Sequence, residues 1–214
     1  MLSKRRLFGF KLDAQSDYIE IGGGEGNLSL DLKRRGLNII LFIEPEFKKY
    51  RVASKKLSNV LCLNIDAGDL DSNQIKPKSK IVTVIMQDVI EHISFEKQKA
   101  FFEIIFSKYD QIYFLGRTPN LKSPFGLRNS FGDNTHINRF TDNSLNDFLE
   151  NLGFKNIRVT KEDYKITGIV SFLRFIPYFI ILLIVSLSFA FIFGTWEGML
   201  TPNINFMSKK FKYK

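Results

Sequence analysis

Cysteine is almost absent from this chain of 214 residues. The single cysteine, Cys62, lies within an apolar run and excludes an intramolecular disulfide, so a reducing compartment is the simplest interpretation. The opening segment, MLSKRRLFGFK, is basic, and its apolar part of about four residues is too short for the core of a signal peptide. We therefore expect an intracellular protein.

The chain is also too short for two complete domains. Its 214 residues suffice for one α/β domain with a full core and an appendage. The formal net charge of +9 is compatible with nucleic acid or with an anionic membrane surface as a partner. No aromatic or arginine-rich platform for nucleic acid is found, so the positive charge favours anionic lipid.

The sequence is organised around residues 18–44, YIEIGGGEGNLSLDLKRRGLNIILFIE. A short apolar strand ends in Glu20, a glycine turn and a helical segment follow, and a second apolar strand ends in Glu44. The glycines of the turn are Gly22, Gly23, Gly24 and Gly26. In a parallel sheet, ligands bind at the carboxyl ends of the strands, where glycine allows close approach and the following helix offers free amides. The turn therefore predicts a nucleotide site, although a plain tight turn is the alternative.

The spacing of the glycines limits which nucleotide is expected. A dinucleotide fingerprint would need a third glycine where Asn27 stands, and no Tyr-x-x-x-Lys pair follows the fourth predicted strand, so a nicotinamide-dependent reductase is disfavoured. The motif present is E-x-G-x-G-x-G, formed by Glu20, Gly22, Gly24 and Gly26. It resembles the first motif of the class I S-adenosylmethionine-dependent methyltransferases.

This resemblance implies a role for an acid at each of three strand ends. In the family, the acid at Glu20 and the glycine turn hold the methionine portion of the cofactor, and an acid at the position of Glu44 binds both ribose hydroxyls. A third strand is predicted at Asn59 to Ile65. The resemblance implies that Asp66 accepts a hydrogen bond from the adenine amino group and that the Ala67 amide meets the ring. Alternatively, Asp66 only caps a turn.

A second motif follows the fourth predicted strand, Ile81 to Met86, whose continuous apolar run is typical of a strand buried on both faces. The next residues, QDVIEH at 87–92, resemble the D-V-L-E-H signature of methyltransferases that act on small and lipid-like acceptors. The resemblance assigns Gln87 and Asp88 to the cofactor pocket. Asp88 and His92 are four residues apart, so we expect them to share a face of a helical turn. His92 is a candidate catalytic base, or else it orients the loop.

The region after the fifth predicted strand, Gln111 to Gly116, is a second candidate for acceptor contacts. Residues 117–140 are rich in Pro, Gly and Asn, and we expect a long loop that folds over the acceptor. His136 in this loop is either the base instead of His92 or a packed anchor. No residue is assigned to a metal site.

The C-terminal part completes the predicted sheet. A helix is expected from Thr141 to Leu152, a sixth strand from Phe154 to Thr160, and a seventh from Asn203 to Lys209. The resemblance places the seventh strand antiparallel between strands five and six. The fold class is therefore α/β, with a doubly wound, mostly parallel seven-stranded sheet of the Rossmann-like methyltransferase type.

A hydrophobic insertion precedes the last strand. Phe175 to Trp196 carries no charge, and a helix of that length, about 33 Å, is long enough to cross a bilayer core. Because the seventh strand must pair with the rest of the sheet, the chain has to return to the side it left, which excludes a single span. A re-entrant hairpin that turns near Ser186 and Ser188, or a helix docked flat on the membrane, remains.

We therefore predict three parts: an S-adenosylmethionine-binding methyltransferase core (1–168), a membrane-associated segment (169–200), and the last strand with a basic tail (201–214). The predicted activity is methyl transfer to a hydroxyl of a lipid-linked or amphipathic acceptor, such as a surface glycan or an isoprenoid-quinone precursor. The predicted location is the cytoplasmic face of a membrane, and no nucleic acid partner is expected. The alternative is a non-catalytic membrane-bound scaffold that kept the fold.

Overall fold

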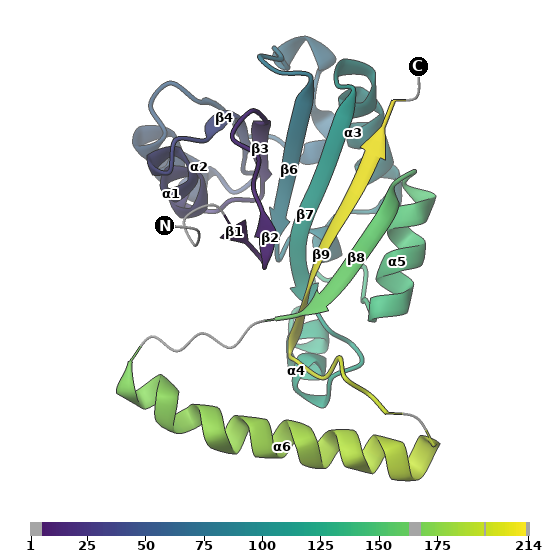
Figure 1. Ribbon diagram of the computed structural model, residues 1–214. Coiled ribbons are helices and arrows are strands. Elements are labelled where there is room, and N and C mark those ends of the chain that lie inside the picture. The colour runs from purple at the N-terminus through teal and green to yellow at the C-terminus, as the bar shows by residue number, and fades with distance from the viewer. Residues whose placement is uncertain (1–5, 163–167, 195, 213–214) are drawn as a thin grey trace.

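The computed structural model describes residues 6–162, 168–194 and 196–212, so Thr195 of the apolar segment and Lys214 of the basic tail lie outside it. Seven strands form one sheet in the order β5-β4-β3-β6-β7-β9-β8 (Figure 1). They are β3 (Asp17–Ile21), β4 (Asn38–Ile43), β5 (Leu61–Leu63), β6 (Ile81–Gln87), β7 (Gln111–Pro119), β8 (Lys155–Lys161) and β9 (Asn203–Phe211). All neighbouring pairs are parallel except those of β9, which runs antiparallel between β7 and β8. The predicted sheet is confirmed.

Helices cover both faces of the sheet. The α-helices are α1 (Asn27–Arg34), α2 (Phe47–Lys56), α3 (Phe95–Lys108), α4 (Pro124–Gly132), α5 (Asp142–Asn151) and α6 (Ile169–Phe193). On one face, α3 and α5 pack on the strands around Phe102, Phe114 and Phe154, whose rings lie 4.7 to 5.5 Å apart. On the other face, Leu32 of α1 and Ala53 of α2 are buried against the sheet. This double coverage explains why β6 is apolar without alternation.

The N-terminal segment forms a small antiparallel hairpin of β1 (Arg6–Leu7) and β2 (Phe10–Lys11). Phe10 is buried against the sheet on the face that α1 also covers. The carboxyl ends of β3, β4, β6 and β7 all lie at one edge of the sheet, because these strands are parallel. The loops that follow these strands therefore meet at one end of the molecule.

The region 117–140 is more ordered than the long loop that the sequence predicts, because it contains α4. Ser123 caps this helix by accepting a hydrogen bond from the Phe125 amide (3.2 Å), and Pro124 occupies the first turn. A side chain at Gly126 would lie 2.0 Å from the Asn120 carbonyl oxygen, so glycine permits the close approach of helix and loop. Gly126, one of the glycines that suggested a loop, therefore allows close packing.

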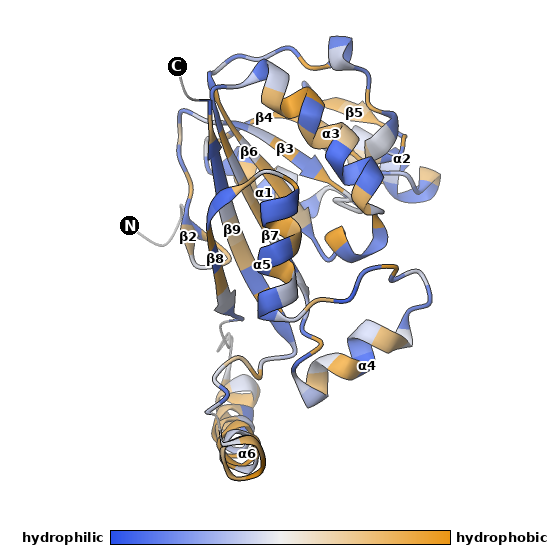
Figure 2. Ribbon diagram, turned by 90° about the vertical axis from the view of Figure 1, so that its right-hand side faces the viewer, coloured by the Kyte–Doolittle hydropathy of each residue, from blue (hydrophilic) through white to orange (hydrophobic). Residues whose placement is uncertain are grey.

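The apolar segment forms one continuous helix, α6, which begins at Ile169, earlier than the uncharged stretch, and includes Pro177. The hairpin alternative is wrong, because Ser186 and Ser188, the candidate turn positions, lie inside this helix. Figure 1 shows α6 crossing beneath the sheet, beside the end at which β6 and β7 terminate. Figure 2 shows α6 as apolar nearly all round, whereas α3 and α5 carry polar stripes. Among the described residues, α6 is the helix long and apolar enough to cross a membrane, and only 6% of its most apolar stretch is buried.

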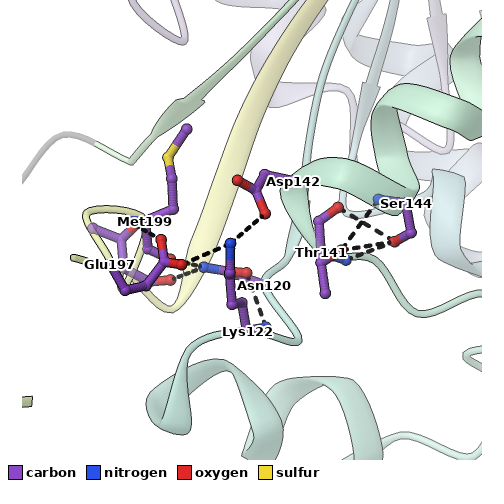
Figure 3. Close-up of polar contacts among 8 residues, drawn as sticks. Asn120, Lys122, Thr141, Asp142, Ser144, Glu197 and Met199 are labelled. Carbon is purple, nitrogen blue, oxygen red and sulfur yellow. Dashed lines mark hydrogen bonds and ion pairs between the residues drawn. The ribbon is translucent and has the colours of Figure 1, made fainter. Parts of the chain in front are cut away.

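The chain returns from α6 to β9 through a segment that is fastened to the core (Figure 3). The Lys122 ammonium lies 2.7 Å from the carboxylate of Glu197 and 3.1 Å from that of Asp142. The buried Asn120 amide donates a hydrogen bond of 2.6 Å to the Met199 carbonyl oxygen. These contacts hold the C-terminal end of α6 close to the loop that follows β7.

Candidate active site

The glycine turn connects β3 to α1 in a backbone conformation that favours glycine. Gly22, Gly24 and Gly26 have φ angles of 64°, 58° and 75°, in the left-handed region. A Cβ at Gly22 would lie 2.5 Å from Val89, whereas one at Gly24 would meet no described atom within 4 Å. The turn is therefore packed against the loop after β6 on one side and open at Gly24.

Glu44 holds this turn at the end of β4. The side chain is buried, and its two carboxylate oxygens accept hydrogen bonds from the amides of Gly24 (2.8 Å) and Glu46 (2.9 Å). A carboxylate offers about four acceptor positions, two on each oxygen, so each oxygen of Glu44 keeps one position that is not used by these amides. Glu44 therefore retains the capacity to accept hydrogen bonds from two hydroxyl groups, which the predicted ribose role requires.

Glu20 connects β3 to the first turn of α1. Its Oε2 accepts hydrogen bonds from the amide (3.0 Å) and the hydroxyl of Ser29. Burial raises the pKa of the Glu20 carboxyl to about 7, although the Ser29 hydrogen bonds oppose this shift. The N-cap residue of α1 is Gly26, which has no side chain to cap the helix, and the first turn holds no acid, so Glu20 supplies the acceptor for the Ser29 amide. The sequence analysis gave Ser29 no role, and the contact of Glu20 with the methionine portion stays a prediction.

Asp66 follows β5 and caps a short 3₁₀ helix, η2 (Ala67–Asp69). Its carboxylate accepts a hydrogen bond from the Gly68 amide (3.2 Å) and pairs with the Lys97 ammonium (2.8 Å). Burial favours the neutral carboxyl, but Lys97 and Gly68 outweigh it and hold the pKa of Asp66 below its usual range. Ala67 is buried at the start of η2. The capping alternative is thus observed, and the adenine contacts of Asp66 and Ala67 stay predictions.

These residues fit the cofactor that the motifs predict. Glu20, Glu44 and Asp66 lie at or directly after the carboxyl ends of three neighbouring strands, β3, β4 and β5. The turn is open at Gly24, and Glu44 keeps free acceptor positions. Glu20 and the turn would hold the methionine portion, Glu44 the ribose, and Asp66 with Ala67 the adenine.

Asp88 follows Gln87, the last residue of β6, and adopts a left-handed conformation with a φ of 54°. The Arg117 guanidinium donates to both carboxylate oxygens of Asp88, through Nε at 3.0 Å and through Nη2, and its Nη1 lies 2.8 Å from Glu162. The Asp88 hydrogen bond raises the pKa of Arg117. Only Ile90–His92 form a helical turn, η4. The prediction that Asp88 and His92 share a helical face is therefore wrong, because Asp88 lies outside this turn in a left-handed conformation, although both residues line one cavity.

Sequence reasoning missed Arg117 and Glu162. Arg117 stands directly after the predicted fifth strand, a position at which side chains reach the ligand edge of the sheet. Its position after the strand could therefore have identified Arg117 as a site residue. Glu162 follows β8 and gave no signal, because its partner is 45 residues away in the sequence.

Both candidate bases lie in one cluster with Glu91. The rings of His92 and His136 are 4.5 Å apart between centroids. Glu91 is buried, its Oε2 accepts a hydrogen bond from the Thr118 hydroxyl (3.1 Å), and burial raises the pKa of its carboxyl to about 7. His136 is also buried and lies 3.3 Å, through Nδ1, from the Ser130 carbonyl oxygen, as an anchor would. Sequence reasoning gave Glu91 no role.

This cluster opens into a cavity of about 490 Å³. Asp88, Arg117 and Asn203 line it from the sheet, and Arg128 and Asn129 of α4 line it from the other side. Val89, which packs against Gly22, connects this region to the glycine turn. A carboxyl with a pKa of about 7 and two imidazoles beside such a cavity are suited to accept a proton from a reacting hydroxyl.

Known proteins share this fold. The structure is similar to a SAM-dependent methyltransferase from Archaeoglobus fulgidus, with a TM-score of 0.62 and 19% identity over 91% of this chain and 86% of that one. It is also similar to a possible histamine N-methyltransferase from Thermotoga maritima, with a TM-score of 0.59 and 15% identity over 92% and 83%. The plantazolicin methyltransferase BpumL, solved with SAH, has a TM-score of 0.56 and 12% identity over 92% and 77%.

No curated protein matches the chain. The methyltransferase domain family, however, matches residues 1–159, which include the glycine turn, all three strand-end acids and the cluster around His92. The chain therefore belongs to the methyltransferase domain family, and the prediction of a class I S-adenosylmethionine-dependent methyltransferase is confirmed.

Proposed function

We propose that this enzyme methylates a hydroxyl group of a lipid-linked or amphipathic acceptor while α6 lies on the cytoplasmic face of a membrane. The observation that carries the proposal is the position of α6, an exposed apolar helix beside the end of the sheet that bears the active-site cavity (Figure 1). The division into a core (1–168), a membrane segment (169–200) and a final strand with its tail (201–214) belongs to the same proposal.

The surface of α6 has the character of a lipid-binding face. The helix has 25 residues, which corresponds to a length of about 37 Å. It exposes large apolar side chains on several sides. Ile176, Leu183 and Leu187 are each more than half exposed. Contiguous apolar surface of this extent is rare on soluble monomers and marks contact sites for membranes or proteins. Because β9 must rejoin the sheet, we infer that the helix lies flat on the bilayer.

A second cavity links α6 to the active site. It has a volume of about 540 Å³ and is lined mainly by apolar side chains of α6 and of the return segment, among them Leu182 and Leu200. Glu162 also lines it, pairs with Arg117 (2.8 Å) and accepts a hydrogen bond from the Asn203 amide (2.8 Å). Arg117 and Asn203 line the active-site cavity. These polar contacts lie between an apolar cavity for a lipid chain and a polar cavity for its head group.

The residues of the active-site cavity have two tasks in the reaction. When bound, S-adenosylmethionine supplies a methyl group on a sulfonium, and the in-line attack of an oxygen on that carbon breaks the sulfur–carbon bond. Arg117 and Asp88 present charged groups that orient a polar head group. Glu91, His92 and His136 are the groups available to receive the proton that the hydroxyl loses.

The experiment that tests the proposal follows a labelled methyl group. Detergent-solubilised protein is incubated with tritiated S-adenosylmethionine and a total lipid extract, and the organic and aqueous phases are counted separately. We expect label in the organic phase with the native protein and none with Glu44→Ala. Label confined to the aqueous phase would refute the lipid-linked acceptor. Cofactor binding without any transfer, across lipid, glycan and quinone-precursor fractions, would favour the non-catalytic scaffold.

A further inference from the structure

Three side chains with the chemistry of metal ligands converge at the active-site cavity. Glu91 and His92 belong to η4, and His136 belongs to the segment between α4 and α5. One potential ligand atom from each lies within 4.8 Å of the other two. The amides of Ile137 and Asn138 both donate hydrogen bonds of 3.0 Å to the Glu91 carbonyl oxygen, which fixes the His136 segment against η4.

The hydrogen bonds of both imidazoles are made through Nδ1, whereas Nε2 of His136 lies 3.9 Å from the Asp133 carboxylate, beyond hydrogen-bond distance. The Thr135 hydroxyl donates to Asp133 (2.6 Å), so it accepts from Nδ1–H of His92 (2.9 Å). Nδ1 of His136 lies 3.3 Å from the Ser130 carbonyl oxygen, which can only accept a hydrogen bond. Each neutral ring therefore carries its hydrogen on Nδ1 and a lone pair on Nε2. Metal-binding histidines are typically oriented by hydrogen bonds of this kind at the second nitrogen.

The carboxylate of Glu91 supplies an independent observation. Its side chain is only 2% exposed, and its Oε1 has no hydrogen-bond partner among the described residues, whereas Oε2 is held by Thr118. A buried carboxylate oxygen without a partner is costly, since its lost hydration is not replaced. A cation beside Oε1 would replace that hydration. The sequence gave no such signal, because Glu91 and His136 are far apart in the chain.

We propose that Glu91, His92 and His136 bind one divalent transition-metal ion, such as Zn²⁺ or Mn²⁺. Two imidazoles and one carboxylate are a ligand set that these ions accept, and three protein ligands leave at least one coordination position open. The cavity that the cluster lines gives an acceptor access to that position.

The proposal rests on the proposed function and refines one part of it. With their ligand atoms on the ion, Glu91, His92 and His136 would not take the proton themselves, and the ion would activate the acceptor hydroxyl instead. An oxygen bound to a divalent cation has a lowered pKa and loses its proton to solvent near neutral pH. That oxygen then forms the bond to the methyl carbon as the bond to sulfur breaks. The products are the methyl ether, S-adenosylhomocysteine and one proton.

The test is calorimetric titration of the full-length, detergent-solubilised protein with Zn²⁺, with Co²⁺ absorption spectra as a second measurement. We expect one equivalent to bind, with the affinity weakened about 100-fold or more in Glu91→Gln and in His136→Gln. Glu103→Gln, an exposed carboxylate on α3, is the matched control and should bind the ion like the native protein. Co²⁺ should give visible absorption bands that both ligand variants lose.

The proposal is overturned if the native protein binds no Zn²⁺, or if both ligand variants bind it as tightly as the control. S-adenosylmethionine binding is measured on every variant to report folding. If Glu91→Gln fails that check, Thr135→Val takes its place. Removal of the hydrogen-bond partner of His92 should lower the affinity for Zn²⁺ about 10-fold. Failure of metal binding with cofactor binding intact rejects the metal site alone. Failure of methyl transfer with metal binding intact rejects the proposed function alone.

Discussion

The two halves of the active site are built in different ways. At the cofactor end, the side-chain contacts of Glu20 and Glu44 stay within one strand, turn, helix and strand unit, as between Gly24 and Glu44, which are 20 residues apart. The Asp66 pair with Lys97 and the packing of Val89 on Gly22 reach beyond this unit. At the acceptor end, Arg117 pairs with Glu162 across 45 residues, and the cavity is completed by α4 and the strand after α6. The Glu20 and Glu44 contacts are therefore encoded locally in this chain, whereas the active-site cavity depends on segments that are distant in the sequence.

The largest expected effect tests the cofactor end. Glu44→Ala should weaken S-adenosylmethionine binding about 1,000-fold, roughly 4 kcal/mol, because two hydrogen bonds to a charged carboxylate would be lost. Glu46→Ala is the control, since this exposed neighbour contributes only its amide to Glu44. Calorimetric titration measures both. Equal affinities in the two variants would show that Glu44 does not hold the ribose.

The next effect tests the acceptor end. His92→Ala and His136→Ala should each lower turnover about 100-fold, as expected for the loss of proton transfer from a hydroxyl. Cofactor affinity should stay within about twofold, since the three strand-end acids are untouched. Full activity in both variants would mean that the acceptor needs no proton acceptor at this position. A parallel loss of cofactor binding would erase the distinction between the two ends.

The buried carboxyl of Glu20 predicts a pH dependence of stability at the cofactor end. Its pKa is about 7 in the folded protein against an ordinary 4.5, so unfolding releases a proton between these values. Stability is therefore highest below pH 4.5 for this group and falls by up to about 3 kcal/mol as the pH rises to 7. Glu20→Gln keeps an acceptor for Ser29 and should flatten that slope.

Urea denaturation across this pH range measures the Glu20 effect. Glu103→Gln serves as the control, because its carboxylate is exposed. An unchanged slope in Glu20→Gln would assign the pH dependence to other groups. Glu91, whose pKa burial also raises to about 7, is the first of these.

A smaller loss of stability is expected at the acceptor end. Arg117→Met would leave Asp88 and Glu162 without their shared cation, and we expect the free energy of unfolding to fall by about 2 kcal/mol. Lys49→Met, which removes an exposed pair with Glu46, should cost less than about 0.5 kcal/mol. Urea denaturation compares the two. Similar values would mean that the Arg117 contacts are solvated like surface pairs.

The smallest effect tests α6. Leu183→Lys combined with Leu187→Lys places two charges on one exposed face of the helix, and binding to anionic vesicles should fall about tenfold. Val52→Lys on α2 is the control for added positive charge, and it should bind vesicles at least as well as the native protein. Vesicle flotation measures the bound fraction. No difference between the variants would contradict the flat-docked helix.

Most of the fold was predictable because its signals are local. The predicted strands ended at Glu20 and Glu44, and the glycine turn lies between them as expected, since apolar runs and positive φ angles are properties of short segments. The helix in the region 117–140 was not predictable, because it includes the close contact of Gly126 with Asn120. The geometry at Asp88 was missed for a related reason, since its backbone has a positive φ angle and its partner, Arg117, is 29 residues away.

The sequence by itself determined the succession of the strands along the chain, the family and the acids at the ends of β3, β4 and β5. It did so because the carboxyl ends of parallel strands meet at one edge, whatever else packs around them. Only the tertiary structure decided that α6 is one helix beside the active site, that Glu20 is buried, and that Glu91, His92 and His136 meet. Burial and convergence arise from segments distant in the chain, and no local pattern contains them.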